Sequence, residues 1–240
     1  MKSNLLRILL LSLVLAPATL LAQDEKTLWI NGDIGLNSNW MVNQNAYQNS
    51  EMNYATSFGL SGGLGICYFL SDGFGVNISP GYVKLGQNYH DELESGTANR
   101  KVKLSYITLP MLIMKEIPMT DNPTWVSFGP ELMLLTSANQ EFKSTDEYPV
   151  YNAAGYKKGD IKERFKPFDL ALHLSIIKMY ELRSSSDMMF FYAFNTAFGL
   201  LDINSKDWQI PDIHDEYKGS HNFYFGIRTG IMFNASGGKY

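Results

Sequence analysis

The feature that most constrains the fold is an alternation of apolar with small or polar residues, which recurs in several segments of the chain. In residues 168–176 every even position is apolar, whereas the odd positions hold Asp169, Ala171, His173 and Ser175. Residues 223–233 repeat the pattern, with phenylalanine or isoleucine at five of the six odd positions. Side chains of a strand point alternately to its two faces, whereas a helix repeats every ~3.6 residues. The alternation therefore predicts β-strands with one apolar and one polar face.

Eight segments of this kind follow one another, separated by connections of two lengths. The strands are expected near Leu28–Asn37, Thr56–Leu70, Phe74–Gln87, Arg100–Ile117, Thr124–Ala138, Lys166–Leu182, Met188–Leu201 and His221–Asn234. Short connections (71–73, 118–123 and 183–187) alternate with long ones (38–55, 88–99, 139–165 and 202–220). Outer-membrane barrels have short periplasmic turns and long external loops. The sequence therefore predicts an all-β fold, an eight-stranded antiparallel transmembrane up-and-down β-barrel.

The distribution of charge decides which strand face meets lipid. The polar face is expected to hold Asn31, Asp33, Ser61, Asn77, Ser79, Glu131, Asp169, His173, Asn195 and Arg228. A charge on the lipid face at the bilayer midplane costs roughly 2–4 kcal/mol. A soluble lipocalin-like barrel would carry its apolar face inward instead. We therefore expect the apolar face to contact lipid and the polar face to line the interior.

Aromatic residues and one proline test this arrangement. Outward aromatic residues are expected at the external end (Phe58, Phe168, Phe223 and Phe225) and at the periplasmic end (Tyr68, Phe74, Phe190, Tyr192 and Phe233), as two girdles. Trp29 and Trp125 fall at the periplasmic level but in the inward phase, which would require a bulge or a shifted strand boundary. Pro110 removes a hydrogen-bond donor from an ambiguous fourth strand, so a bulge or irregular pairing is expected there.

The N-terminus predicts export. Lys2 and Arg7 accompany a short apolar core, Ile8–Ala16, and Ala22 is a small residue suited to cleavage. These features predict a cleaved signal peptide at 1–22, with 23–240 as a single outer-membrane β-barrel domain. The formal net charge of −4 argues against binding to nucleic acid. The single cysteine, Cys67, excludes a disulfide framework and is expected to be a small inward-facing side chain.

Several motifs carry a family resemblance. The stretch Gly59–Val83, followed by Tyr106-Ile107-Thr108-Leu109-Pro110, resembles the PorT-type outer-membrane β-barrel family. Phe128-Gly129-Pro130-Glu131 and the closing strand Phe225–Phe233 are similar to that family too. The resemblance implies a bacterial outer-membrane protein of the Bacteroidota type that takes part in type IX protein secretion. The implied partners are other secretion-system proteins, outer-membrane lipid and, during insertion, the barrel-assembly machinery.

The inward polar residues allow more than one interpretation. The interior of an eight-stranded barrel is about wide enough to be filled by its own side chains. Arg228 is therefore expected to form a buried ion-pair network with Glu131, Asp169 or Asp33; the alternative is a path for protons or ions. A His-x-Ser pair on a barrel strand, here His173 and Ser175, resembles outer-membrane lipid A deacylases, in which histidine activates serine. The flanking residues do not match that family, and an interior polar pair is expected.

No other cluster points to catalysis or metal binding. Asp169 and His173 are four residues apart on a strand, about 13 Å at ~3.3 Å per residue. His90, His214 and His221 lack ligand spacing. We therefore expect no enzyme activity, cofactor or metal. The longest loop carries Tyr148, Tyr151 and Tyr156, which either bind partners or pack on the barrel rim.

These observations define three candidate functions. The first is a non-enzymatic barrel that acts through its loops in a membrane assembly, by resemblance the type IX secretion machinery. The second is a lipid-modifying outer-membrane enzyme that uses His173 and Ser175. The third is a structural or adhesive barrel with no role in secretion.

Overall fold

The computed structural model describes residues 27–43, 52–71, 73–118, 124–145, 147–150, 155–182, 187–211 and 215–236. The predicted signal peptide, Tyr151 and His214 lie outside these ranges. The strands are β1 (Thr27–Val42), β2 (Asn53–Ala55), β3 (Phe58–Ser71), β4 (Phe74–Ile78), β5 (Gly81–Leu93), β6 (Gly96–Ile117), β7 (Thr124–Ser144), β8 (Gly159–Asp160), β9 (Phe168–Glu181), β10 (Met188–Gly199) and β11 (His221–Asn234). Two short 3-10 helices are η2 (Lys162–Arg164) and η3 (Lys206–Trp208). No helix of the described ranges is long and apolar enough to cross a membrane.

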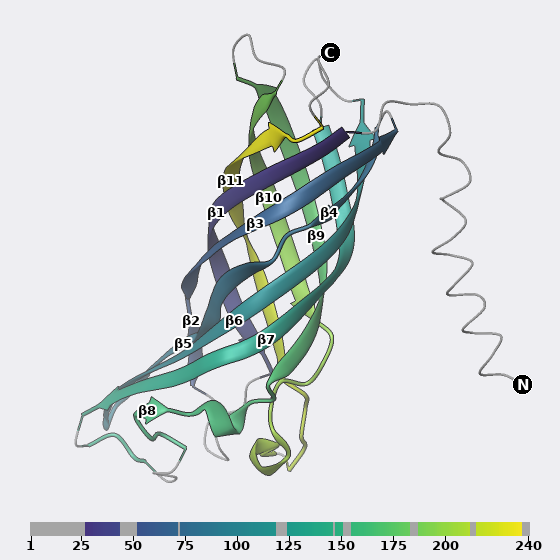
Figure 1. Cartoon of the computed structure of the whole chain (residues 1–240). Helices are drawn as coiled ribbons and strands as arrows, with labels where there is room; N and C mark the ends of the chain where they lie inside the picture. Colours follow the sequence, from purple (N-terminus) through teal and green to yellow (C-terminus); the bar gives the residue numbers. More distant parts are fainter. Residues whose placement is uncertain are drawn as a thin grey trace, which may run out of the picture.

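The long strands close into an antiparallel ring (Figure 1). β1 pairs with β3 on one side and with β11 on the other, and β6, β7, β9 and β10 complete the circuit. β4 and β5 together occupy one place, because each pairs with both β3 and β6. The ring therefore has eight positions, which confirms the predicted barrel. Both ends of the described chain, at Thr27 and Ser236, lie at the end of the barrel where the short turns connect the strands (Figure 1).

An interruption at Ser79–Pro80 divides the third predicted strand into β4 and β5. Pro80 has no N–H to donate, but its carbonyl accepts a hydrogen bond from Leu64 N at 3.1 Å. Ser79 N donates to the carbonyl of Pro110 at 3.3 Å. A bulge or irregular pairing was expected at Pro110. Pro110 instead lies opposite Glu131 of β7 with no shift of register, and the shift between these two strands lies at Ser105 and Tyr106. β6 itself alternates without a break, with Tyr106, Thr108, Pro110 and Leu112 facing inward.

The two strand faces are distributed as the charge argument predicts. Ile34, Leu64 and Ile227 are 70%, 71% and 64% exposed, and they belong to an apolar belt contributed by every position of the ring. On the opposite face, Glu131 and His173 are buried inside the ring. A continuous apolar surface of this extent is not tolerated in water. The belt is therefore the surface that meets hydrocarbon.

The interior is less uniformly polar than predicted. Trp29 and Trp125 are 1% and 6% exposed and occupy regular inward positions, so the expected bulge or shifted boundary is wrong. They belong to an apolar cluster at the short-turn end, which we call the turn-end core: Trp29, Cys67, Met114, Trp125, Met179, Phe191 and Met232. The actual bulge lies where Ser105 and Tyr106 of β6 face Ser137 and Leu135 of β7, which leaves Thr136 unpaired. Cys67 is fully buried, as predicted.

At the long-loop end the sheet continues beyond the ring. β6 and β7 contain 22 and 21 residues, about twice the ~9–11 needed to cross a bilayer. The connection expected at 88–99 is instead a hairpin in which Leu93 pairs with Gly96, and Gly96 adopts φ 140°, which favours glycine. β2 pairs with β5 and β8 pairs with β7 in this region. We call the outer parts of β5, β6 and β7, with β2 and β8, the external blade (Figure 1).

Two loop tyrosines pack against the external blade. Tyr148 and Tyr156 are 7% and 5% exposed. The Tyr148 hydroxyl donates to Asp91 Oδ2 at 2.8 Å, and the Tyr156 ring lies 4.5 Å from that of Phe142. Of the two alternatives left open for these tyrosines, rim packing is the one the structure adopts.

Asp202 organises the loop between β10 and β11. Its carboxylate accepts hydrogen bonds from Ser220 N at 3.0 Å, Gln209 Nε2 at 2.7 Å and the Tyr217 hydroxyl at 2.9 Å. Burial alone would raise the pKa of Asp202, but these bonds and one from Asn204 N outweigh it and lower the pKa. Burial, with the hydrogen bond to Asp202, raises the pKa of Tyr217 to about 12, so its hydroxyl stays protonated at neutral pH.

This loop is expected to loosen in acid. Because the folded pKa of Asp202 lies below its unfolded value of about 3.9, its stabilising contribution is present above that pH and is lost as pH falls through the folded pKa. Amide hydrogen exchange of residues 202–220 should therefore accelerate as the pH falls below about 4, after correction for intrinsic rates. An Asp202→Asn variant should exchange faster at pH 7 and lose this dependence. Equal pH dependence in both proteins would contradict the assignment.

Candidate functional site

A polar layer crosses the barrel interior between two apolar clusters. On one side lies the turn-end core. On the other lies a larger cluster, the external core, which includes Met41, Leu104, Met133, Phe142 and Ile203. The polar side chains between them come from β1, β4, β7, β9, β10 and β11, whose inward positions alternate with the lipid-facing residues. This layer contains the inward charged residues predicted from the sequence, including Asp33, Glu131, His173 and Arg228.

Glu131, His173 and Ser175 form one hydrogen-bonded line. β7 and β9 are paired so that Gly129 lies opposite His173, and Glu131, two residues further along β7, points to the same inner face. Glu131 Oε2 lies 2.7 Å from His173 Nδ1, and His173 Nε2 lies 2.9 Å from Ser175 Oγ. The Tyr224 hydroxyl donates to the same Glu131 oxygen at 2.7 Å. If His173 Nδ1 carries the proton donated to Glu131, Nε2 accepts the Ser175 hydroxyl proton.

This order of groups is that of a serine nucleophile, its base and an orienting carboxylate. Glu131, His173 and Ser175 are, however, 2%, 1% and 5% exposed inside the ring. A reaction at Ser175 would require a substrate to reach it, and ligand pockets typically have volumes of ~300–1,000 Å³. The space beside Ser175 is a cavity of about 50 Å³. The geometry therefore satisfies three buried polar groups and leaves no room for a lipid chain.

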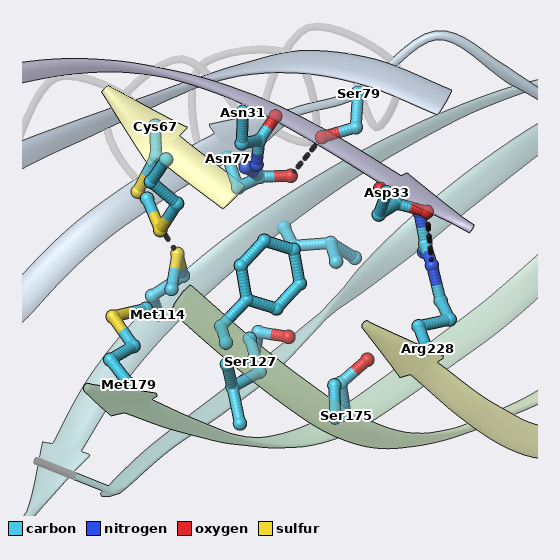
Figure 2. Close-up of a pocket in the computed structure, with 15 residues that line it drawn as sticks. Asn31, Asp33, Cys67, Asn77, Ser79, Met114, Ser127, Ser175, Met179 and Arg228 are labelled. Carbon is cyan, nitrogen blue, oxygen red and sulfur yellow. Dashed lines mark hydrogen bonds and ion pairs between the residues drawn. The ribbon is translucent and has the colours of Figure 1, made fainter. Parts of the chain in front are cut away.

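The cavity lies between the polar layer and the turn-end core. Figure 2 shows Ser127 and Ser175 on one wall and Asn31, Asn77 and Ser79 on the other, with the sulfur atoms of Cys67 and Met114 at one end. The cavity is partly polar, and its volume is enough for a few water molecules. Asn31 Oδ1 and Ser127 Oγ, which have no protein hydrogen-bond partner among the described residues, belong to two of the residues that line it.

Arg228 pairs with Asp33, one of the three carboxylates predicted as its partners. Its guanidinium donates from Nε to Asp33 Oδ1 at 2.9 Å and from Nη2 to both carboxylate oxygens at 2.6 Å, between β11 and β1 (Figure 2). The side chains of Asp33 and Arg228 are 3% and 17% exposed. Glu131 bonds instead to His173, and Asp169 accepts from Asn222 Nδ2 at 2.9 Å. The expected network therefore consists of separate satisfied pairs.

Two interior tyrosines complete these pairs and were not assigned a role from the sequence. Tyr224 donates to Glu131, and the Tyr106 hydroxyl accepts from Asn222 Nδ2 at 3.1 Å. Both lie in the inward phase of their strands, so alternation placed them inside. The hydrogen-bond partners of these tyrosines depend on which strands face one another across the barrel. Alternation within a single strand gives no information on that arrangement.

The described residues contain no group of three or more His, Cys, Asp or Glu side chains that could hold a metal ion. His90 Nδ1 lies 2.9 Å from Asn99 Oδ1 on the external blade. The ring of His221 stacks on Phe198 at 5.7 Å. The contacts given for His90 and His221 are therefore with an amide and an aromatic ring.

A closed antiparallel ring with a lipid-facing belt and a filled interior defines an outer-membrane β-barrel. The chain belongs to the outer membrane protein beta-barrel domain family, whose model matches residues 21–204. The protein is accordingly located in the bacterial outer membrane. No curated protein sequence matches the chain.

Solved structures of other outer-membrane proteins share the general architecture. Neisserial surface protein A is 8% identical, with 88% of this chain and 99% of that chain covered and a TM-score of 0.39. OprG from Pseudomonas aeruginosa is 13% identical, with coverages of 88% and 96% and a TM-score of 0.40. Ail of Yersinia pestis, in complex with sucrose octasulfate, is 9% identical, with coverages of 86% and 99% and a TM-score of 0.34. Likeness at this level carries no information on activity or ligands.

The Asp33–Arg228 pair is expected to stabilise the barrel only as a pair. Asp33→Asn should lower the free energy of unfolding by roughly 3–5 kcal/mol, because it leaves the Arg228 charge buried without a counterion. The double variant Asp33→Asn/Arg228→Met should recover most of that loss, since it removes both charges. Urea unfolding in phospholipid vesicles measures both effects. A double variant no more stable than Asp33→Asn would show that the loss has another origin.

Proposed function

We propose that this protein is a non-enzymatic outer-membrane β-barrel that acts through its external loops in a membrane assembly. In line with the resemblance to the PorT-type family, the assembly is the type IX protein secretion machinery. Its other partners are outer-membrane lipid and, during insertion, the barrel-assembly machinery.

The observation that carries this proposal is the filled interior. The turn-end core and the external core pack apolar side chains across the ring on both sides of the polar layer. The cavity next to Ser175 and Arg228 has a volume of only about 50 Å³. A barrel filled in this way offers neither a wide channel nor a substrate pocket at these residues. The surfaces left for recognition are the outer wall and the loops.

The external structure is suited to recognition because much of it is ordered. The loops that follow β7 and β10 are joined by an isolated bridge between Phe165 and Asn204. The Arg164 guanidinium lies 4.2 Å from the centroid of the Trp208 ring and donates to Gly155 O at 2.7 Å. A rigid surface loses less conformational entropy on binding than a disordered one. This arrangement favours a docking role over that of an inert membrane filler.

Deletion of the gene tests the proposal. Loss of the protein should reduce the amount of exported protein that reaches the medium, and the wild-type gene should restore it. The Ser175→Ala variant should restore secretion equally well, because Ser175 has no catalytic role in this account. Normal secretion in the deletion strain would favour a structural or adhesive barrel without a secretion role.

The hydrogen-bonded line from Glu131 to Ser175 keeps the lipid-modifying enzyme as a second candidate. That function requires Ser175 as nucleophile. Lipid mass spectra of the deletion strain complemented with wild-type protein or with Ser175→Ala decide between the two. A lipid modification present with wild-type protein and absent with Ser175→Ala would establish the enzyme, whereas identical spectra would remove it.

A further inference from the structure

A basic groove lies on the outer wall of the barrel, immediately beyond the apolar belt. It has a volume of about 430 Å³, and its lining includes the side chains of Lys84, Lys101 and Lys103. All three lysines point outward from β5 and β6, and they form no part of the interior polar layer. The groove is therefore separate from the site described above.

The register of the sheet fixes the height of these lysines. Tyr82, Ile107 and Leu134 are laterally paired across β5, β6 and β7 and form the last apolar row of this wall. In the next row Lys84 lies opposite Ser105, and in the following one Lys103 lies opposite Gly86. Each row rises ~7 Å along the strand, or roughly 5 Å along the membrane normal at a tilt of ~40°. The polar region of each leaflet is about 5–8 Å thick, so the backbone of Lys84 lies within it. The backbones of Lys103 and of Lys101, which lies opposite Asn88, are one and two rows further out, and their long flexible side chains reach back toward the headgroups.

The groove carries a positive charge that this protein does not neutralise by itself. Lys103 forms a salt bridge with Glu141, and both groups are more than half exposed. Among the described residues, Lys84 and Lys101 form no salt bridge. The hydrogen bond and charge of Lys103, with smaller contributions from the charges of Lys101 and Lys143, hold the pKa of the Glu141 carboxyl below its usual range. The field at this wall is therefore that of several cations around one carboxylate.

The remainder of the outer wall differs at this height. β1, β10 and β11 contain no lysine and instead bring together Trp40, Phe223 and Phe225, with Trp40 stacked on both phenylalanines at 5.8 and 5.4 Å. Stacked aromatic residues suit a generic lipid interface. Lys84, Lys101 and Lys103 thus lie on β5 and β6, away from β10 and β11, and the exposed ring of Phe58 also lines the groove.

We propose that this groove binds a phosphorylated lipid of the outer leaflet. The ammonium groups of Lys84, Lys101 and Lys103 contact the headgroup phosphates, while Asn88, Ser105 and Asn139 supply hydrogen bonds to its polar groups. The acyl chains lie along the apolar belt below, against Tyr82 and Ile107. A lipid fits better than a soluble anion because the groove opens directly onto a surface that is already covered by lipid chains. The proposal adds a lipid site to the proposed function and does not depend on the secretion role.

The test measures lipid binding to the purified mature protein in detergent by native mass spectrometry. The probes are lipid A carrying two phosphates and the same lipid without its phosphates, with inorganic phosphate as competitor. The test variant is Lys84→Gln/Lys101→Gln/Lys103→Gln. The matched control, Lys115→Gln/Lys158→Gln/Lys206→Gln, removes the same charge from exposed positions outside the groove.

Binding of the phosphorylated lipid should be about 100-fold weaker in the test variant at low salt, and unchanged in the control. Replacement of the same three lysines by arginine should preserve binding, which separates loss of charge from loss of fold. Equal binding of the two lipids, or wild-type affinity in the test variant, would overturn the proposal. So would complete competition by millimolar inorganic phosphate, which would indicate a soluble-anion site. If the test variant instead keeps its lipid and loses a protein partner, the wall is a protein interface and the lipid assignment is wrong.

Discussion

The absence of water in the hydrocarbon layer is the constraint on which this structure depends. A backbone N–H or C=O group that meets lipid without a partner costs several kcal/mol, so strands cross a membrane only in a closed ring. The pairing of β1 with β11 completes that closure. The same constraint reverses the arrangement of a water-soluble protein, in which apolar side chains are inside and charged ones outside. Here Leu64 and Ile227 face outward, while Glu131 and His173 are buried among protein groups. The lysines of the outer wall begin only where this constraint ends.

Inside the ring the energetic problem is that of any protein core. Each buried charge needs a partner, since an unpaired one is strongly destabilising. Arg228 pairs with Asp33, and Glu131 receives hydrogen bonds from His173 and Tyr224. Apolar side chains fill the space on either side of this polar layer. The hydrogen-bonded line to Ser175 is accordingly explained by the need to satisfy buried groups.

Much of the barrel could be predicted from the sequence because strand alternation is a local signal. It assigned the inward phase of Asp169 and Arg228, and the bounds of the last strand, His221–Asn234, agree with β11. The sequence predicted four long connections, of which 88–99 is a hairpin that extends β5 and β6. Strand length was underestimated because the outer parts of β6 and β7 reverse the pattern of the belt, with apolar side chains such as Val102 and Phe142 inward and lysines outward. The partner of Arg228 was left open among three carboxylates, because the pairing of β1 with β11 is set by closure over the whole chain. Trp29 and Trp125 were misread because aromatic residues were expected only at the lipid interface, whereas they fill the turn-end core.

The central claim, that apolar side chains face lipid and polar ones face the interior, is tested most directly through the tryptophans. Trp40 points outward, whereas Trp29 and Trp125 point inward. Single-tryptophan variants that retain only Trp29, Trp40 or Trp125 can be reconstituted in lipids brominated near the headgroup end of the acyl chains. Bromine quenches tryptophan fluorescence on contact, so the account predicts strong quenching of Trp40, which lies outward against Phe223 and Phe225. Trp29 and Trp125, buried within the ring, should be largely protected. Strong quenching of Trp29 and Trp125 with protection of Trp40 would contradict the arrangement of apolar residues toward lipid and polar residues inside.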